Sequence, residues 1–514
     1  MSKTIIIIGA GLAGLSAALQ AAENGCNVKL VSSLPSERAQ SVMAEGGINA
    51  ALNTKDENDS PEEHFTDTIK AACGLADPNA VWGMTQAAPE LVHWLLKLGV
   101  KFNMSGYDDV DLRNFGGQKK KRTAFAQSDT GKQIMTAMID AVRRKEASGM
   151  VERVSHHSFL TLRLCGNICC GCVIRDEYSQ ETVELPGDAV IVATGGMHGL
   201  FGNTTGSLSN TGEVTAELFR LGVPLANGEM IQYHPTTVKC GGKRMLISEA
   251  ARGEGGRLFA MKDGKQWYFM EEKYPELGNL MPRDITAREI WKVSHESEVF
   301  LDMTEISDEI ISNKLSGLAD DCMTYLHKDI RKEPVSVLPG IHYFMGGILV
   351  DEQHRTPIQN LYAAGECCAQ YHGANRLGGN SLLGALYGGR VAAKSACEQA
   401  DVVDLSCATQ IDFPPASQIS EIKQLNKVMQ ETMGVVRNEN TLLNGIQTVQ
   451  ALTGNLPLLG MAVLKSALAR KESRGAHWRE DYPKSNDDDY LKTTVARFDG
   501  KQIQISFVPV PERR

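Results

Sequence analysis

The hydrophobic pattern at the start of the chain predicts a strand, a glycine turn, a helix and a second strand. Residues 5–8 are four consecutive isoleucines, a run typical of a buried strand. The glycine-rich turn at 9–14 leads into the small-residue stretch 15–23, which predicts a helix. The run 27–33 (NVKLVSS) then predicts the second strand. This order of elements indicates an α/β fold.

Two later apolar runs also end in glycine. They are 188–196 (DAVIVATGG) and 360–366 (NLYAAGE), and the second is followed by a loop and a small-residue helix. Three strand-to-glycine transitions so far apart predict one sheet assembled from distant segments. The stretch 227–340 reads as an insertion with its own helices and strands, the latter at RLFAM and EVFLDM.

After residue 396 the pattern becomes polar and helical. Met461, Leu464 and Leu468 stand at helical spacing in the stretch MAVLKSALARKE. They predict a helical bundle packed on the outside of the molecule. A stripe of this kind is far more often core than cofactor site.

Length and charge limit the classes of function. A chain of 514 residues suggests two or three domains, and its net charge of −9 argues against nucleic acid as a partner. The basic run 119–122 (KKKR) is either a targeting patch or a local anion-facing or solvated loop, and we favour the second. No stretch approaches the ~20 apolar residues that span a bilayer. The chain is therefore expected to be soluble and to reach a membrane only through partners.

The twelve cysteines form no disulfide-like framework, and no secretory signal is visible, so a reducing cytoplasm is expected. Cys165, Cys169, Cys170 and Cys172 are spaced closely enough to suggest a metal or cluster site. However, the stretch ICCGCVI reads as a buried strand, in which cysteine behaves as a small apolar residue. We favour the structural role and predict no metal.

The turn Gly9-Ala10-Gly11-Leu12-Ala13-Gly14 has the spacing of a dinucleotide-binding fingerprint between a strand and a helix. Its glycines allow backbone N–H groups and the helix N-terminus to approach a pyrophosphate. The second strand ends in Ser32-Ser33 rather than in the acid that commonly binds the ribose, and hydroxyls can replace it. The absence of a second such fingerprint suggests a flavin whose electrons are not exchanged with a nicotinamide.

Histidines and arginines recur beside glycines farther along the chain. They stand in QYHPT, SEAARGEGG, PRD, HYFMGG and HGANRLGG. Each one alone would usually be a structural residue. Together, these histidines and arginines favour an anion site, because arginine grips a carboxylate bidentately and histidine adds a donor. A substrate with two carboxylates would need two such clamps.

These stretches, together with AEGG, ATGG, GECCAQYHGANRLGGNSL and ESRGAHWRED, resemble the flavoprotein subunits of fumarate reductases and succinate dehydrogenases. L-aspartate oxidase is a near relative. The resemblance covers nearly the whole chain. It implies a Rossmann-like FAD-binding domain (1–226 and 341–396), an inserted α+β capping domain (227–340) and a C-terminal helical domain with a tail (397–514).

The resemblance also implies a mechanism in which FAD passes a hydride from N5 to fumarate. Arg283 resembles the family's proton donor, and Glu249 and Arg252 match the residues that relay its proton. Because the pKa of arginine exceeds ~12, such a donor must be reprotonated at once. By the same resemblance, the substrate carboxylates are held by His234 with Ser248 and by His342 with Arg376.

Gln40 stands where the respiratory members of the family carry the histidine that bonds to the flavin. Glutamine cannot form that bond, so non-covalent FAD is expected, and the balance tilts towards fumarate reduction or an aspartate-oxidase-like role. The FAD-binding positions that the resemblance carries over are Gly9, Ala10, Gly11, Leu12, Ala13, Gly14, Ser32, Ser33, Gln40, Ser41, Ala44, Glu45, Gly46, Gly47, Glu213, Glu366, Ser381 and Leu382.

The C-terminal region is shorter than the family usually carries, although ESRGAHWRED is retained. In the family this region helps to dock an iron–sulfur subunit, so such a partner is expected at the cytoplasmic side, where it can link the chain to the inner face of the membrane. The leading hypothesis is a fumarate reductase-type flavoprotein, reversible to succinate oxidation. The alternatives are L-aspartate oxidase and a flavin-binding assembly module without catalysis.

Overall fold

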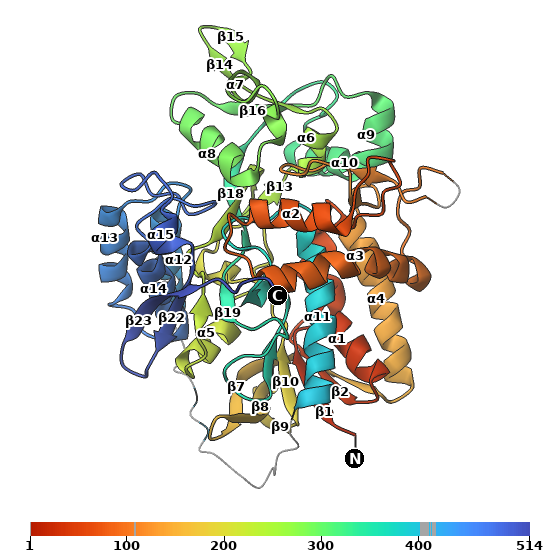
Figure 1. Ribbon diagram of the computed structural model, residues 1–514. Helices are drawn as coiled ribbons and strands as arrows, with labels where there is room; N and C mark the ends of the chain where they lie inside the picture. The colour runs from red at the N-terminus through yellow and green to blue at the C-terminus, as the bar shows by residue number, and fades with distance from the viewer. Residues whose placement is uncertain (1, 107–108, 401–410, 412, 414–417) are drawn as a thin grey trace.

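A five-stranded parallel sheet lies at the centre of the chain, in the order β20-β10-β1-β2-β6. The computed structural model describes residues 2–106, 109–400, 411, 413 and 418–514 (Figure 1). The prediction of one sheet from three distant apolar runs is confirmed, because β1 pairs with β10 and β10 with β20, all parallel. The strands are β1 (Thr4–Ile8), β2 (Asn27–Ser32), β6 (Val151–Ser155), β10 (Ala189–Val192) and β20 (Leu361–Ala363).

The isoleucine run of β1 is buried on both faces of this sheet. Ile5 and Ile7 pack against helices, whereas Ile6 and Ile8 pack against a second, three-stranded sheet. The helices are α1 (Leu12–Glu23), α3 (Pro78–Leu98), α4 (Thr130–Ala147) and α11 (Asn380–Gln399), which lie together in Figure 1. The second sheet consists of β7 (His157–Cys165), β8 (Ile168–Asp176) and β9 (Thr182–Pro186).

The cysteine cluster falls on this second sheet. Cys169, Cys170 and Cys172 are buried on β8, as the strand interpretation expected. No group of three or more histidine, cysteine or acidic side chains suited to a metal ion occurs within the described ranges. Cys165 is disulfide-bonded, which departs from the expectation of reduced thiols throughout.

The inserted segment forms two small sheets with helices between them, and its strands at RLFAM and EVFLDM are confirmed as β14 and β16. One sheet contains β12 (Ile231–Cys240), β13 (Lys243–Leu246) and β18 (Leu338–Phe344). The other contains β14 (Arg257–Lys262), β15 (Lys265–Trp267), β16 (Val299–Asp302) and β17 (Val335–Ser336). The helices are α6 (Glu249–Gly253), α7 (Phe269–Lys273), α8 (Arg283–Val293), α9 (Asp308–Lys314) and α10 (Ser316–Asp321).

The C-terminal region combines helices with a β-hairpin that the sequence analysis missed. The helices are α12 (Ile419–Thr432), α13 (Glu439–Val449) and α14 (Asn455–Ala469), and Leu464 of α14 is in their core, with Met461 and Leu468 packed against it. The region predicted as a tail instead forms β22 (Lys492–Phe498) and β23 (Ile503–Pro509). The hairpin extends a sheet with β11 (Leu225–Ala226), β19 (Gly347–Leu349) and β21 (Cys368–Ala369). The remaining helices and strands include α2 (Pro61–Ala71), α5 (Glu213–Arg220), α15 (Asp487–Tyr490), β3 (Ile48–Asn49), β4 (Leu112–Arg113) and β5 (Thr123–Ala124).

Charged side chains of the stretch ESRGAHWRED face the interior of this region. Arg470, just before it, is fully buried and lies 2.7 Å from Glu229 and 2.7 Å from Glu472. Arg474 lies 2.8 Å from the same Glu472 carboxylate. These ion pairs tie the end of α14 to the segment before β12. The charges of Arg470, Glu472 and Arg474 are therefore paired within the chain.

Among the residues that the structure describes, no helix has both the length and the apolar character needed to cross a bilayer.

The basic run 119–122 divides into a buried and a solvated part. Arg122 is fully buried and lies 2.9 Å from Asp59 and 3.0 Å from Asp67. Lys121 is half exposed and lies 3.8 Å from Glu57. Arg122 is therefore part of the interior, and the solvated-loop interpretation applies to Lys121.

Replacing Arg122 should destabilise the fold strongly. Arg122→Met leaves two buried carboxylates without their cation, so the free energy of unfolding should fall by about 3–5 kcal/mol in denaturant titrations. The neighbouring Lys121→Met is the matched control and should change it by less than ~0.5 kcal/mol, because its ion pair is exposed. Equal effects of the two substitutions would contradict this description.

Candidate active site

One cavity of about 870 Å³ extends from the glycine turn after β1 to helices α6 and α8 of the inserted segment. Nearly all the residues that the sequence analysis singled out line it. The predicted FAD-binding residues that line it are Gly9–Ala13, Ser32, Ser33, Gln40, Ser41, Ala44–Gly47, Glu213, Glu366, Ser381 and Leu382. The predicted substrate-binding and catalytic residues that line it are His234, Ser248, Glu249, Arg283, His342 and Arg376. The structure thus brings the two predicted groups into one space. Gly14 and Arg252 lie behind its wall.

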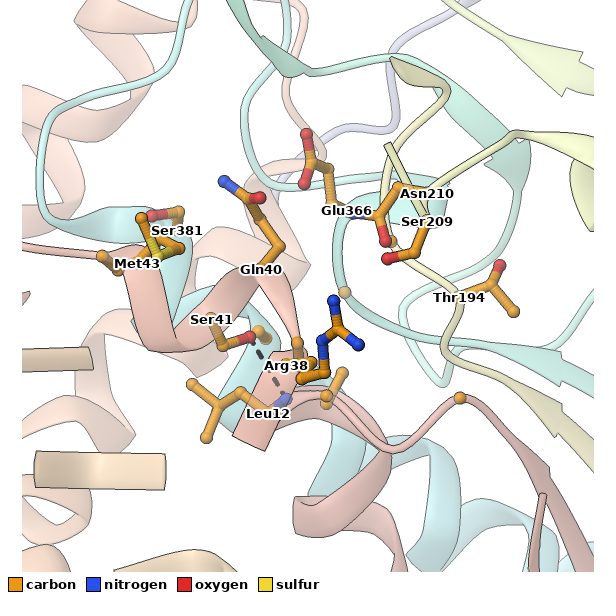
Figure 2. Close-up of a pocket in the computed structure, with 18 of the residues that line it drawn as sticks. Leu12, Arg38, Gln40, Ser41, Met43, Thr194, Ser209, Asn210, Glu366 and Ser381 are labelled. Carbon is orange, nitrogen blue, oxygen red and sulfur yellow. Dashed lines mark hydrogen bonds between the residues drawn. The ribbon is translucent and has the colours of Figure 1, made fainter. Parts of the chain in front are cut away.

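Two glycines of the turn are required by close backbone contacts. A Cβ atom at Gly14 would lie 1.8 Å from the carbonyl oxygen of Gly9. At Gly9, whose φ is +109°, a Cβ atom would lie 2.3 Å from the carbonyl oxygen of Ala193 on the neighbouring strand segment. The turn therefore brings the N-terminus of α1 directly to the cavity, and Ser41 accepts a hydrogen bond from the Leu12 N–H at 3.2 Å (Figure 2).

A second helix N-terminus opens into the same cavity. α11 begins at Asn380 after Gly379, whose φ is +84°, and Ser381 and Leu382 in its first turn line the cavity. The first N–H groups of a helix have no partner within the helix and carry partial positive charge. Two helix N-termini beside a bare glycine turn fit a ligand with a pyrophosphate, and the length of the cavity beyond them leaves room for a flavin ring system.

The loop 44–47 is held by a residue that the sequence analysis did not assign. Arg113 is buried and donates to the carbonyl oxygens of Glu45 at 3.2 Å and Gly46 at 2.5 Å. Burial, with Asp321 nearby, raises the pKa of Glu45 to about 8, so its side chain is protonated at neutral pH. The loop is thereby fixed with a neutral side chain at the cavity wall.

Arg283 and Glu249 form a buried ion pair at the far end of the cavity. Arg283 is the first residue of α8 and Glu249 the first residue of α6. The Nε and Nη2 groups of Arg283 donate to one oxygen of Glu249 at 2.8 and 2.6 Å. Both side chains line the cavity. The guanidinium of Arg283 is therefore within reach of a ligand bound in the cavity.

Arg252 lies one helical turn after Glu249, and its Nη2 atom is 3.4 Å from the second carboxylate oxygen. The same oxygen accepts a hydrogen bond from the Gly116 N–H at 3.1 Å. Burial works to raise the pKa of Glu249, but Arg283 and Arg252 outweigh it and lower that pKa below its usual value. Glu249 is therefore an ionised carboxylate between two guanidinium groups.

Gln232 is a connecting residue whose role the sequence analysis missed. Its side-chain oxygen accepts a hydrogen bond from Arg283 Nη1 at 3.1 Å. Its amide nitrogen donates to the Asn375 side chain at 2.9 Å and to the carbonyl oxygen of Arg376 at 2.8 Å. The amide therefore fixes Arg283 relative to Arg376. Its place in QYHPT, two residues before His234, was the available signal.

His234 and His342 face each other on the paired strands β12 and β18. Their ring centroids are 5.1 Å apart. Burial, with Arg283 beside both rings, lowers the pKa of each well below its usual value, so both are neutral. Nδ1 of His234 lies 3.0 Å from the Thr236 carbonyl oxygen, and Nδ1 of His342 lies 2.7 Å from the Thr205 hydroxyl. Each ring is thus fixed through Nδ1 and presents its other edge at the cavity.

Arg376 is buried over the ring of Tyr343, with 4.3 Å between the guanidinium carbon and the ring centroid. Burial, with Arg283 nearby, lowers its pKa to about 9. Within the described part of the chain, its buried Nε–H has no hydrogen-bond partner. An unpartnered N–H on a buried cation is costly unless a ligand accepts from it, which marks this end of the cavity as an anion site.

Further polar side chains line the part of the cavity nearer the glycine turn. They include Arg38, Thr194 and Asn210, which are labelled in Figure 2 with Gln40 and Glu366. Arg38 stands six residues after the end of β2, the strand that ends without the acid that commonly binds the ribose, and it adds a positive charge to this part of the cavity. Thr194 stands in the ATGG stretch, which was the available signal, whereas no sequence signal separated Asn210 from other loop residues.

Comparisons with known proteins show which family this chain resembles. The family model described as an FAD binding domain matches residues 4–382, and the one described as the fumarate reductase flavoprotein C-terminal region matches residues 452–513. The fold resembles the E. coli quinol fumarate reductase FrdA, with a TM-score of 0.90 and 27% identity over 99% of this chain and 97% of that one.

The curated relatives cover the chain along its whole length. The succinate dehydrogenase flavoprotein subunit of Bacillus subtilis is 38% identical over 100% of this chain and 98% of its own. The 8-methylmenaquinol:fumarate reductase flavoprotein subunit of Wolinella succinogenes is 32% identical over 100% of this chain and 92% of its own. The chain belongs to the fumarate reductase and succinate dehydrogenase flavoprotein subunits, a family of FAD-dependent oxidoreductases.

Proposed function

We propose that this chain is the flavoprotein subunit of an enzyme that reduces fumarate to succinate. The observation that carries the proposal is the buried Arg283–Glu249 pair, which faces a cavity shared with the predicted FAD residues. Three buried arginines, 252, 283 and 376, surround one ionised carboxylate at this end. The excess of positive charge suits a dianionic substrate.

FAD, bound along the glycine turn and the N-termini of α1 and α11, would supply the hydride. Arg283 would supply the proton to the other alkene carbon. Its guanidinium is held on one side by Glu249 and on another by Gln232, which leaves its orientation fixed. Such preorganised placement lowers the barrier because little reorganisation is needed during the reaction.

The proton that Arg283 donates must be replaced at once, because a neutral guanidine is far too basic to persist. The ionised Glu249 carboxylate, 2.6 Å from Nη2 of Arg283, would deliver a proton to Arg283 as it takes one from Arg252, whose Nη2 lies 3.4 Å from its other oxygen. Arg252 does not line the cavity, so the proton would reach Arg283 from behind the cavity wall.

Two groups of donors would hold the substrate carboxylates. His234 with Ser248 would bind one, and His342 with the unpartnered Nε–H of Arg376 would bind the other. The two histidines are neutral, so they would bind by hydrogen bonding, and the arginines would supply the charge. Holding both ends of fumarate in this way would twist and polarise its double bond towards the transition state.

The cofactor is proposed to be non-covalent FAD. Gln40 lines the cavity where the respiratory relatives carry a linking histidine, and an amide forms no bond to the flavin. Electrons would come from an iron–sulfur subunit at the cytoplasmic side, with the membrane reached through partners. The relatives named above are themselves subunits of larger enzymes, which supports this arrangement.

The direct test is the anaerobic oxidation of a reduced viologen dye by the purified, FAD-loaded chain. Oxidation that depends on fumarate, with succinate as the product, would support the proposal. A chain that holds FAD, ignores fumarate and converts L-aspartate to its imine would be an L-aspartate oxidase instead. A chain that holds FAD and turns over neither compound would refute the reductase activity.

Arg283→Ala should lower fumarate turnover by about 10²–10⁴-fold, the usual contribution of a positioned acid, while the FAD content stays unchanged. Arg288→Ala is the matched control on the same helix, because Arg288 stacks on Trp478 at 4.0 Å and does not line the cavity. The control should retain turnover. An Arg283→Ala chain that reduced fumarate at the normal rate would remove Arg283 as the proton donor.

Acid precipitation of the holoprotein should release all of its flavin into the supernatant. The reason is that Gln40 offers no nucleophile for a bond to the cofactor. Absorbance and fluorescence of the two fractions measure the partition. Flavin that stayed with the washed precipitate would show a covalent link and would contradict the assignment.

A further inference from the structure

The side chain of Gln40 is bound to the protein itself. Its Oε1 atom accepts a hydrogen bond from the backbone N–H of Ser207 at 2.5 Å. Gln40 opens a short 3-10 turn (Gln40–Met43), and Ser207 belongs to the segment 204–207, which we call the bridging loop. The two segments are far apart in sequence. The position where relatives tether the flavin is here used to hold a loop.

The bridging loop has no regular secondary structure, so contacts with other elements decide where it lies. Thr204, which is fully buried, lies with its hydroxyl 3.0 Å from Nδ1 of His198. The Thr205 N–H donates to the carbonyl oxygen of Ile341 at 3.0 Å. Gln40 holds the loop from the other side, through Ser207. Without that bond, the Ser207 end of the loop would lose its hydrogen-bond partner on the Gln40 turn.

The same loop orients a residue of the proposed substrate site. The Thr205 hydroxyl lies 2.7 Å from Nδ1 of His342 but 3.4 Å from the Ile341 carbonyl oxygen. The Thr205 hydroxyl therefore fixes the orientation of the His342 ring through Nδ1 and leaves Nε2 for a ligand in the cavity.

We propose that Gln40 is a positioning residue for the substrate site, which acts through Ser207 and Thr205 on the orientation of His342. The inference rests on the proposed function and deepens it. The glutamine that replaces the flavin-linking histidine keeps the loop over the cavity in the geometry that binds a dicarboxylate.

The test measures succinate binding to the FAD-loaded chain by the change in flavin absorbance on titration. Gln40→Leu keeps the size of the side chain and removes the acceptor, and Gln40→Glu keeps an acceptor oxygen. We expect Gln40→Leu to weaken succinate binding about tenfold, equal to about 1.4 kcal/mol, and Gln40→Glu to bind nearly as the parent chain does. Arg288→Ala is the control, because Arg288 stacks on Trp478 and contacts neither the bridging loop nor the cavity, and it should bind succinate as the parent chain does.

Thr205→Val should weaken binding to a similar extent, because it removes the hydroxyl that fixes His342. The double variant Gln40→Leu/Thr205→Val should lose little more than the larger single loss, because both changes act through one loop. Additive losses would overturn the proposed coupling. Unchanged binding by Gln40→Leu would overturn it as well.

A Gln40→Leu chain that no longer retains FAD would also overturn the proposal, because it would place Gln40 in cofactor retention. Measurements on the parent chain distinguish a failure of this inference from a failure of the proposed function. If the FAD-loaded parent shows no response to succinate or fumarate, the proposed function fails. If the parent responds and Gln40→Leu responds equally, only the inference about Gln40 fails.

Discussion

A buried ion pair between Arg283 and Glu249 is the interaction on which the rest of the site depends. Removing two charges from water costs several kcal/mol for each ion, and only good geometry with further hydrogen bonds compensates for that cost. The structure supplies hydrogen bonds from Gln232 and the Gly116 N–H, and Arg252 adds an ion pair with the second oxygen of Glu249. The pair therefore depends on the inserted segment, because that segment carries both α6 and α8.

The flavin end of the cavity follows from a different constraint, the close approach of backbone to ligand. Gly9 and Gly14 have no space for a side chain, and α1 and α11 direct their N-termini at the same cavity. The helix N-termini place partial positive charge at one end of the cavity, and the arginines place full positive charge at the other end. The arrangement suits a cofactor with phosphates at one end and an anionic substrate at the other.

Much of this arrangement could be predicted from sequence where the signal was local. The isoleucines of β1 and the apolar runs of β10 and β20 marked the strands, and the motifs marked the residue types. The partners of those residues could not be predicted, because they come from distant segments. Arg113 carried no signal and Gln232 only its place in QYHPT, and the ion pairs that bury Glu472 of ESRGAHWRED could not be read from that stretch. The hairpin β22–β23 was missed because β22 mixes polar with apolar residues and the alternating residues of β23 lie in a stretch interpreted as a tail.

The most direct measurement is a structure of the FAD-loaded chain with succinate bound. The account predicts one carboxylate against His234 and Ser248, and the other against His342 and Arg376. It also predicts that Arg283 lies within hydrogen-bonding or proton-transfer distance of a methylene carbon while still paired with Glu249. Succinate bound elsewhere, or Arg283 turned away from it in a catalytically active chain, would contradict the assignment of the site.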